Sequence, residues 1–175
     1  MISAVPLAKT MKNVIVTRTF SKAFCLASVR CGYLIAHPST VEQMKARYNP
    51  KSINQFAQIA AHHALEAFDS YYAPYIKSTN HSRDKFLADL LSQGVQVQSG
   101  GAGNFVCIYV PSGKTRALCE RLEQDAIFVR DIGGRFPNHI RITIGLDMTR
   151  VTSALIDSLR TLGEIPNSSD ASSSK

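Results

Sequence analysis

A lysine and an arginine lie among hydroxyl side chains in the short segment 19–33, between two apolar runs. Ser21 directly precedes Lys22, and Arg30 follows the lysine by eight positions. A lysine in apolar surroundings loses its proton more readily and becomes a nucleophile toward aldehydes. Hydroxyl and guanidinium groups are donors that bind phosphate. The residue types therefore predict a nucleophilic lysine beside a phosphate site.

Each of these residues also has a simpler interpretation. Lys22 could be a surface lysine in a polar turn, and Arg30 could form a surface ion pair. Thr19 and Ser21 could satisfy backbone groups of the turn, a role that is compatible with phosphate binding. The spacing of the whole segment favours the chemical interpretation.

The segment resembles the lysine motif of the fold-type-I, pyridoxal-phosphate-dependent aminotransferases of class I/II. The pattern of that family is a hydroxyl residue, any residue and Ser-Lys. An Arg follows eight positions after the lysine, and Gly-Tyr or Gly-Phe stands two positions further. The matching residues are Thr19, Ser21, Lys22, Arg30, Gly32 and Tyr33. Within this superfamily the chain is most similar to the histidinol-phosphate aminotransferases.

The resemblance implies that the cofactor is pyridoxal 5'-phosphate. It implies that Lys22 forms the Schiff base with the cofactor and moves a proton between the substrate α-carbon and the cofactor. Ser21 and Arg30, with Thr19 in support, would hold the cofactor phosphate. The implied reaction moves an amino group between histidinol phosphate and 2-oxoglutarate, in histidine biosynthesis. A related aromatic or other amino-acid aminotransferase is the nearest alternative.

Two further arginines, Arg130 and Arg141, lie in apolar, strand-like runs. Arginine among β-branched residues is costly to bury without an anion, and a carboxylate or phosphate bound bidentately satisfies it. An ion pair with a local acid, for instance Arg130 with Asp131 or Asp125, is the alternative. The resemblance implies that both arginines bind the acidic end of the substrate, and that Arg141 matches the carboxylate-binding arginine of aminotransferases.

Tyr48 and Asn104 are further candidates for contact with the substrate. Tyr48 stands where the family often has an aromatic residue at the cleft, with packing at a helix end as the alternative. Asn104 opens a strand in a Gly-x-x-Asn-Phe context similar to that of the family, with backbone capping as the alternative. His62 and His63 have no second ligand at i+4, so no metal site is predicted.

Two positions depart from the family pattern. Cys25 and Ser28 stand where the family normally has glycine, a residue that permits close backbone packing or a positive φ. The turn is therefore expected to form with backbone strain.

Hydrophobic periodicity predicts the elements that position these residues. Strands are expected over 13–18 and 32–36, on either side of the lysine segment. A helix should start at Pro38 and end before Pro50, followed by helices over 53–67 and 70–92. Beyond these, we expect strands over 95–97, 104–110, 127–130 and 139–144, and helices over 112–124 and 147–162, the last capped by Asp147.

This order predicts an α/β fold class with an α+β small domain. The resemblance implies the C-terminal part of the fold-type-I transferase fold, including the last strands of the large-domain sheet. We expect residues 1–50 to be the remnant of the large cofactor-binding domain. Residues 51–163 would form a helical link and the small domain, and 164–175 a disordered, serine-rich tail.

The resemblance covers about residues 5–163 and matches only the C-terminal half of the family. It implies that the other half supplies most of the central sheet and the aspartate that pairs with the pyridine nitrogen. The full protein is therefore expected to transaminate, whereas the activity of this chain alone stays open. From a different class, the chain could be a catalytically inactive fragment or dimerisation module.

Composition argues against several other classes of protein. A hydrophobic content of 45% and a charged content of 19% are those of a soluble globular protein. No apolar run approaches the roughly 20 residues that span a bilayer, and residues 1–12 contain no block of signal-peptide length. The four cysteines show no ligand spacing, so we expect reduced thiols.

The partners are expected to be small molecules. The net charge of +7 is spread along the chain rather than clustered, so no nucleic-acid partner is predicted. The resemblance implies an amino acid or amino alcohol phosphate and a 2-oxo acid as substrates. It also implies a homodimer, and the composition is consistent with a cytoplasmic location.

Overall fold

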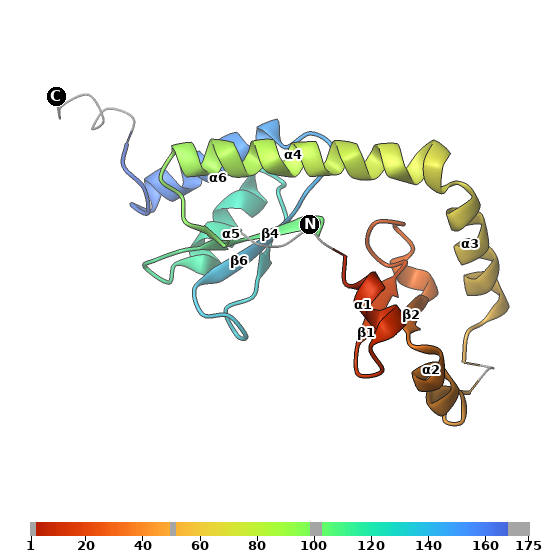
Figure 1. Cartoon of the computed structure of the whole chain (residues 1–175). Coiled ribbons are helices and arrows are strands. Elements are labelled where there is room, and N and C mark those ends of the chain that lie inside the picture. The colour runs from red at the N-terminus through yellow and green to blue at the C-terminus, as the bar shows by residue number, and fades with distance from the viewer. Residues whose placement is uncertain (1–2, 50–51, 99–102, 168–175) are drawn as a thin grey trace. The chain divides into compact units, whose positions relative to one another are not determined.

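The computed structural model describes residues 3–49, 52–98 and 103–167. The chain divides into two compact units, Met1–Pro74 and Tyr75–Lys175 (Figure 1). None of the helices in the described ranges combines the length and apolarity that a bilayer crossing requires. Most of the glycine-rich turn at 100–103 and of the expected tail lies outside these ranges.

The first unit contains a two-stranded antiparallel sheet. Helix α1 (Val5–Thr10) precedes β1 (Ile15–Thr19), and β2 (Gly32–Ala36) pairs with β1 from Ile15↔Ala36 to Thr19↔Gly32. At Gly32 a Cβ would lie 2.7 Å from the backbone carbonyl oxygen of Arg18, so the close approach of the strands requires glycine. The strand predicted at 32–36 is confirmed, and that at 13–18 starts two residues later than predicted.

Helices follow this sheet along the chain. They are α2 (Pro38–Lys45), α3 (Gln55–Glu66), the π-helical turn η2 (Phe68–Tyr72) and α4 (Ala73–Ser92). The side chain of Asn54 caps α3 by accepting a 2.8 Å hydrogen bond from the Ala57 N–H. The helix predicted over 70–92 starts only at Ala73, because residues 68–72 form the wider π-helical turn. Pro74 therefore lies in the first turn, where it is tolerated.

The second unit contains a four-stranded antiparallel sheet in the order β3-β4-β6-β5. Its further elements are β3 (Val97–Gln98), β4 (Phe105–Tyr109), α5 (Thr115–Gln124), β5 (Arg130–Asp131), β6 (His139–Thr143) and α6 (Thr149–Thr161). The predicted strands at 95–97 and 127–130 are displaced toward the C-terminus, to 97–98 and 130–131. The expected α+β order is otherwise confirmed.

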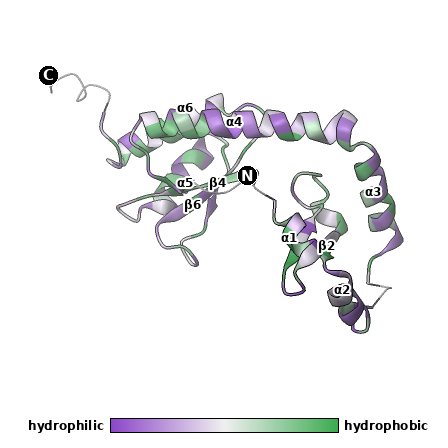
Figure 2. Cartoon of the chain, in the orientation of Figure 1, coloured by the Kyte–Doolittle hydropathy of each residue, from purple (hydrophilic) through white to green (hydrophobic). Residues whose placement is uncertain are grey.

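The sheet of the second unit has one buried and one open face. Val106, Ile108, Ile140 and Ile142 alternate along β4 and β6 and are at most 4% exposed. Leucines of α4, α5 and α6 join them in one hydrophobic core: Leu90, Leu118, Leu122, Leu155 and Leu159. Much of α4 is coloured hydrophilic in Figure 2, and its buried side chains recur three or four residues apart on one face: Thr79, Ser82, Phe86 and Leu90. The residues between the buried positions of β4 and β6 therefore form the open face.

Ile165, near the start of the expected tail, is packed. It is 8% exposed and belongs to the core.

Asp147 accepts a 2.9 Å hydrogen bond from the Thr149 N–H, although the N-cap position itself is Met148. This backbone hydrogen bond lowers the pKa of the Asp147 carboxyl.

Candidate functional site

The lysine turn (residues 20–31) is closed by backbone hydrogen bonds at the end of the β1–β2 ladder. The Phe20 N–H donates to the Cys31 carbonyl at 3.1 Å, and the Leu26 N–H donates to the Phe20 carbonyl at 3.0 Å. Inside this loop, the Cys25 N–H donates to the Lys22 carbonyl at 2.9 Å. Lys22 therefore lies in a tight turn with defined backbone geometry.

Aromatic side chains anchor the lysine turn to the helices of the first unit. Phe20 is 3% exposed and clusters with Ala61 and Ala64 of α3. The Phe24 ring lies 4.9 Å from the rings of both Phe20 and Tyr72, measured between centroids. The apolar residues of the turn are thus directed inward.

Because these aromatic residues pack inward, they do not enclose the amine. Lys22 is exposed in this chain. The expectation that the lysine is desolvated is therefore not met by the residues of this chain. Its apolar neighbours in sequence, Phe20 and Phe24, pack on α3 and η2 instead.

The polar residues of the turn leave donors for an anion. The Thr19 hydroxyl accepts a 3.0 Å hydrogen bond from the Ser21 N–H, so the turn-stabilising role considered for Thr19 is realised. Arg30 donates from Nη1 to the Ala27 carbonyl at 3.0 Å. Within the described ranges, neither the Ser21 hydroxyl nor the other guanidinium nitrogens of Arg30 have a protein partner. Ser21 and Arg30 each lie one residue beyond the Phe20–Cys31 pair, at the same end of the ladder.

Backbone strain is present at one of the two positions where it was predicted and at Arg30, where it was not. Cys25 has a φ of 55° and Arg30 a φ of 54°, in the left-handed region. The strain expected at Cys25 is therefore confirmed. Ser28 instead lies within the 3-10 helix η1 (Ala27–Val29), and its φ is not positive.

The second unit brings Arg130 and Arg141 together. The two are direct partners across β5 and β6, and Cys107 of β4 is the partner of Arg141 on its other side. Direct partners share a face of the sheet, so all three lie on the open face. The Arg141 guanidinium carbon lies 5.4 Å from the centroid of the Phe105 ring.

The ion pairs considered for these arginines do not form. Asp131 accepts hydrogen bonds from the Thr115 hydroxyl at 3.0 Å and from the Gly133 N–H at 2.7 Å. Across the described ranges, no carboxylate pairs with Arg130 or Arg141. The Arg141 Nε is moreover buried and has no hydrogen-bond partner there. The pair is thus a cationic site without a counter-charge from the described residues.

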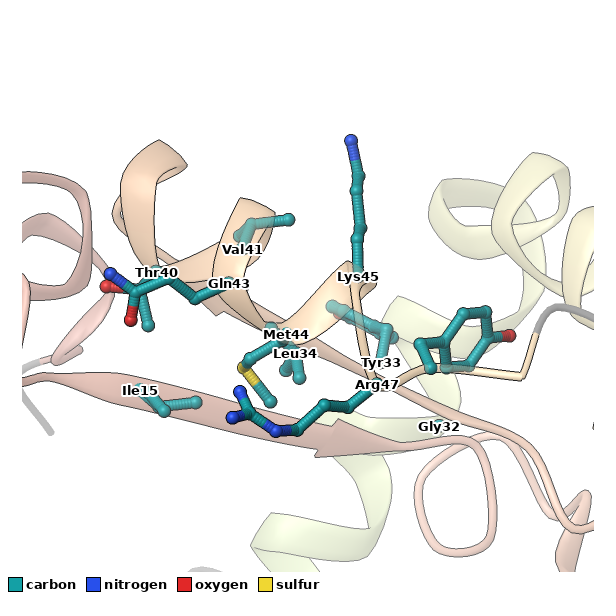
Figure 3. Close-up of a pocket in the computed structure, with 11 residues that line it drawn as sticks. Ile15, Gly32, Tyr33, Leu34, Thr40, Val41, Gln43, Met44, Lys45 and Arg47 are labelled. Atoms are coloured by element: carbon teal, nitrogen blue, oxygen red, sulfur yellow. The ribbon is translucent and has the colours of Figure 1, made fainter.

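Tyr48 and Asn104 differ in what surrounds them. Tyr48 is 54% exposed and lines an open groove of about 770 Å³ between the β1–β2 sheet and α2. Figure 3 shows that Ile15, Leu34 and Met44 form the apolar part of this groove. Lys22 is not among the residues that line it. The Asn104 main-chain carbonyl accepts a 2.8 Å hydrogen bond from the Ile144 N–H, next to the β4–β6 pairing.

Histidine and cysteine side chains have other roles. Glu66 stands four residues after His62, so the expectation of no possible ligand at i+4 is wrong for His62. The ring nitrogens of His62 and His63 lie 3.4 Å and 2.8 Å from the Glu66 carboxylate oxygens. No three His, Cys, Asp or Glu side chains of the described ranges cluster as metal ligands would. All four cysteines are free thiols, and burial raises the pKa of Cys119.

Sequence reasoning did not single out Phe105 and Cys107. Both lie on the open face beside Arg141. The alternation of 105–109 places them on one face of a strand, but the register with β6 is needed to bring them next to the arginine.

The chain matches the family "Aminotransferase class I and II" over residues 1–156, and it belongs to that family. It is 37% identical over 146 residues to the dihydroxyacetone phosphate transaminase Cj1437c of Campylobacter jejuni, covering 82% of this chain and 39% of the relative. It is 34% identical over 144 residues to histidinol-phosphate aminotransferase 1 of Carboxydothermus hydrogenoformans, covering 82% and 40%. The predicted family is confirmed.

The fold is similar to that of the histidinol-phosphate aminotransferase from Sinorhizobium meliloti, crystallised in complex with pyridoxal-5'-phosphate. The TM-score is 0.71 at 28% identity, covering 90% of this chain and 44% of that chain. The predicted fold class is therefore confirmed. The chain spans about two fifths of the length of the curated relatives that it matches.

Proposed function

We propose that this chain supplies the reactive lysine and the anion sites of a pyridoxal-phosphate-dependent aminotransferase. The observation that carries the proposal is the closed turn in which Ser21, Lys22 and Arg30 occur together at one end of the β1–β2 ladder. Family membership supports it, as does the cofactor bound to the relative from S. meliloti. In this proposal, residues 1–50 belong to the cofactor-binding domain, and 51–163 form the link and the small domain.

The residues of the turn fit the cofactor chemically. The Ser21 hydroxyl and the uncommitted guanidinium nitrogens of Arg30 suit a phosphate dianion, and the Thr19 hydroxyl supports Ser21 through its backbone N–H. Bound pyridoxal phosphate supplies an aldehyde that condenses with amines and a ring that withdraws electrons. The Lys22 amine is the group of this chain that bonds to the aldehyde. The substrate amine would displace Nζ, which would then accept the proton from the substrate α-carbon and deliver it to the cofactor.

Arg130 and Arg141 bind the anionic end of the substrate in this proposal. Two guanidinium groups without a local carboxylate favour a dianion over a single carboxylate. A phosphate ester fits best, and the names of the two curated relatives refer to phosphorylated compounds. We therefore propose histidinol phosphate as amino donor and 2-oxoglutarate as acceptor, in histidine biosynthesis. Tyr48 and Asn104 stay proposed substrate contacts, and the enzyme is proposed to be a cytoplasmic homodimer.

The cofactor proposal is tested with the purified chain. Pyridoxal phosphate is titrated into the wild type, the visible spectrum is recorded before and after borohydride, and labelled peptides are identified by mass spectrometry. We expect the label on Lys22, with loss of the visible band in Lys22→Ala. Lys12→Ala is the matched control, since Lys12 is an exposed lysine of the same unit. A folded chain labelled equally on Lys12 and Lys22 contradicts the proposal.

An inactive binding module is the second candidate. The exposure of Lys22 favours it, since exposure is typical of a surface lysine without a catalytic role. Amino transfer from histidinol phosphate separates the two functions. If histidinol phosphate changes the visible band of the bound cofactor but no glutamate forms, the result supports the inactive module. Conversion of 2-oxoglutarate to glutamate supports the enzyme.

A further inference from the structure

The Arg141 guanidinium is held without a hydrogen-bonding protein partner. Its Nε is buried and unbonded among the described residues, and no carboxylate faces it there. A long, flexible side chain in this situation would ordinarily move to water, where each N–H is satisfied. The orientation of Arg141 must therefore come from a contact of another kind.

The Phe105 ring provides that contact. Phe105 pairs with Thr143, and Cys107 pairs with Arg141, so Phe105 is the diagonal neighbour of Arg141 on the open face. Diagonal neighbours in a sheet are within reach of aromatic and long side chains. The guanidinium carbon lies 5.4 Å from the ring centroid, within the range of a cation–π interaction.

Because of the strand order, Arg130 and Phe105 both favour a position of the Arg141 guanidinium on the β4 side. β6 lies between β4, which carries Phe105, and β5, which carries Arg130. The like charge of Arg130 repels the guanidinium from the β5 side, while the ring attracts it from the β4 side. The directly opposite residue on β4 is Cys107, whose short thiol is a weak acceptor and does not compete for the guanidinium.

We propose that Phe105 is a positioning residue for Arg141. Its ring fixes the plane of the guanidinium and keeps the Nη donors available for an anion. The inference rests on the proposed function, in which Arg141 binds the anionic end of the substrate. Phe105 itself need not touch the substrate.

The first test observes Arg141 in the free protein. Nitrogen NMR of the Arg141 Nε–Hε group is recorded for the wild type, Phe105→Leu and Phe105→Tyr. Leucine keeps much of the bulk and removes the ring, whereas tyrosine keeps the ring. We expect Phe105→Leu to shift the resonance and to speed rotation of the guanidinium, and Phe105→Tyr to match the wild type. An unchanged resonance and rotation rate in Phe105→Leu overturns the inference.

The second test titrates inorganic phosphate into the same three proteins. Loss of a cation–π contact at a partly exposed site should weaken phosphate binding at Arg141 about two- to five-fold in Phe105→Leu. Phe105→Tyr should bind as the wild type does. Cys107→Asp places a carboxylate opposite the guanidinium and should abolish binding.

The two tests separate the inference from the function on which it rests. If phosphate leaves Arg141 of the wild type unperturbed, the anion site of the proposed function is wrong, and the first test still decides the positioning role. If Phe105→Leu binds phosphate as tightly as the wild type, the positioning role is wrong while the anion site stands.

Discussion

The two units of the chain differ in the size of their hydrophobic cores and in the proposed site residues that they contain. In the second unit, side chains from α4, α5, α6 and the sheet form one continuous hydrophobic core. Among the described residues of the first unit, the buried cluster consists of Phe20, Ala61 and Ala64. Large apolar side chains of that unit are exposed instead, including Phe56 at 84% and Tyr71 at 64%. The proposed reactive lysine therefore lies in the unit with the smaller core, and the proposed substrate arginines in the unit with the larger one.

The largest expected effect compares one buried and one exposed leucine. Leu118→Ala in α5 should lower the free energy of unfolding by about 2–5 kcal/mol, because the residue is 0% exposed. Leu65→Ala in α3 should change it by less than about 0.5 kcal/mol, because that residue is 52% exposed. Urea denaturation followed by circular dichroism measures both. A comparable loss in Leu65→Ala means that this face of α3 is covered in solution, and the contrast between the units fails.

The second prediction concerns the close approach of β1 and β2. Gly32→Ala would place a Cβ 2.7 Å from the Arg18 carbonyl oxygen, so the strands must separate. The expected cost is about 1–3 kcal/mol, confined to the first unit. Hydrogen exchange of the β1 and β2 amides measures this cost, and we expect the exchange to become faster. Gly134→Ala in the second unit is the control, since no atom lies within 4 Å of its added Cβ. Unchanged protection in Gly32→Ala contradicts the prediction.

The third prediction tests strain in the lysine turn. Cys25→Gly should stabilise the first unit by about 1 kcal/mol, because glycine adopts the φ of 55° without steric cost. Cys25→Ala keeps the strain and removes the thiol, so it should show no gain. Amide exchange in residues 20–31 distinguishes the variants. Equal gains in both would assign the effect to the thiol rather than to the backbone.

The smallest expected effect is a pH dependence in the second unit. Its hydrogen bond lowers the pKa of Asp147, so the folded state favours the carboxylate. This contribution to stability is present above the ordinary pKa of aspartate. It is lost as the pH falls through the lowered, folded-state pKa. Asp147→Asn should flatten the fall of the melting temperature as the pH drops below the ordinary pKa of aspartate, since the amide does not titrate. If the melting temperature of Asp147→Asn falls as steeply with decreasing pH as that of the wild type, the result argues against this role.

Local sequence predicted the elements around the lysine well. Strand 32–36 follows from the short apolar run at 33–36, and the helix that begins at Pro38 follows from proline at a first turn. The motif also identified the position of backbone strain at Cys25. Each of these features depends on residues close together in the chain.

Features set by distant residues were harder to predict. The pairing of Arg130 with Arg141 depends on the register of β5 against β6, and the predicted strand 127–130 was displaced to 130–131. The exposure of Lys22 depends on Phe24 packing against η2, which the sequence did not predict. Helix α1 was missed because its six residues are too few for a periodic pattern.

The left-handed backbone at Arg30 affects how substitutions there are interpreted. Alanine at this position retains the φ of 54° at full steric cost and removes only the guanidinium. Glycine removes the guanidinium and also relaxes the main chain. The difference between these two variants isolates the conformational energy of a single residue. The difference between alanine and the wild type combines the ligand contact with the hydrogen bond that Arg30 donates to the Ala27 carbonyl. A scan that used glycine alone would record increased stability and hide the lost binding group.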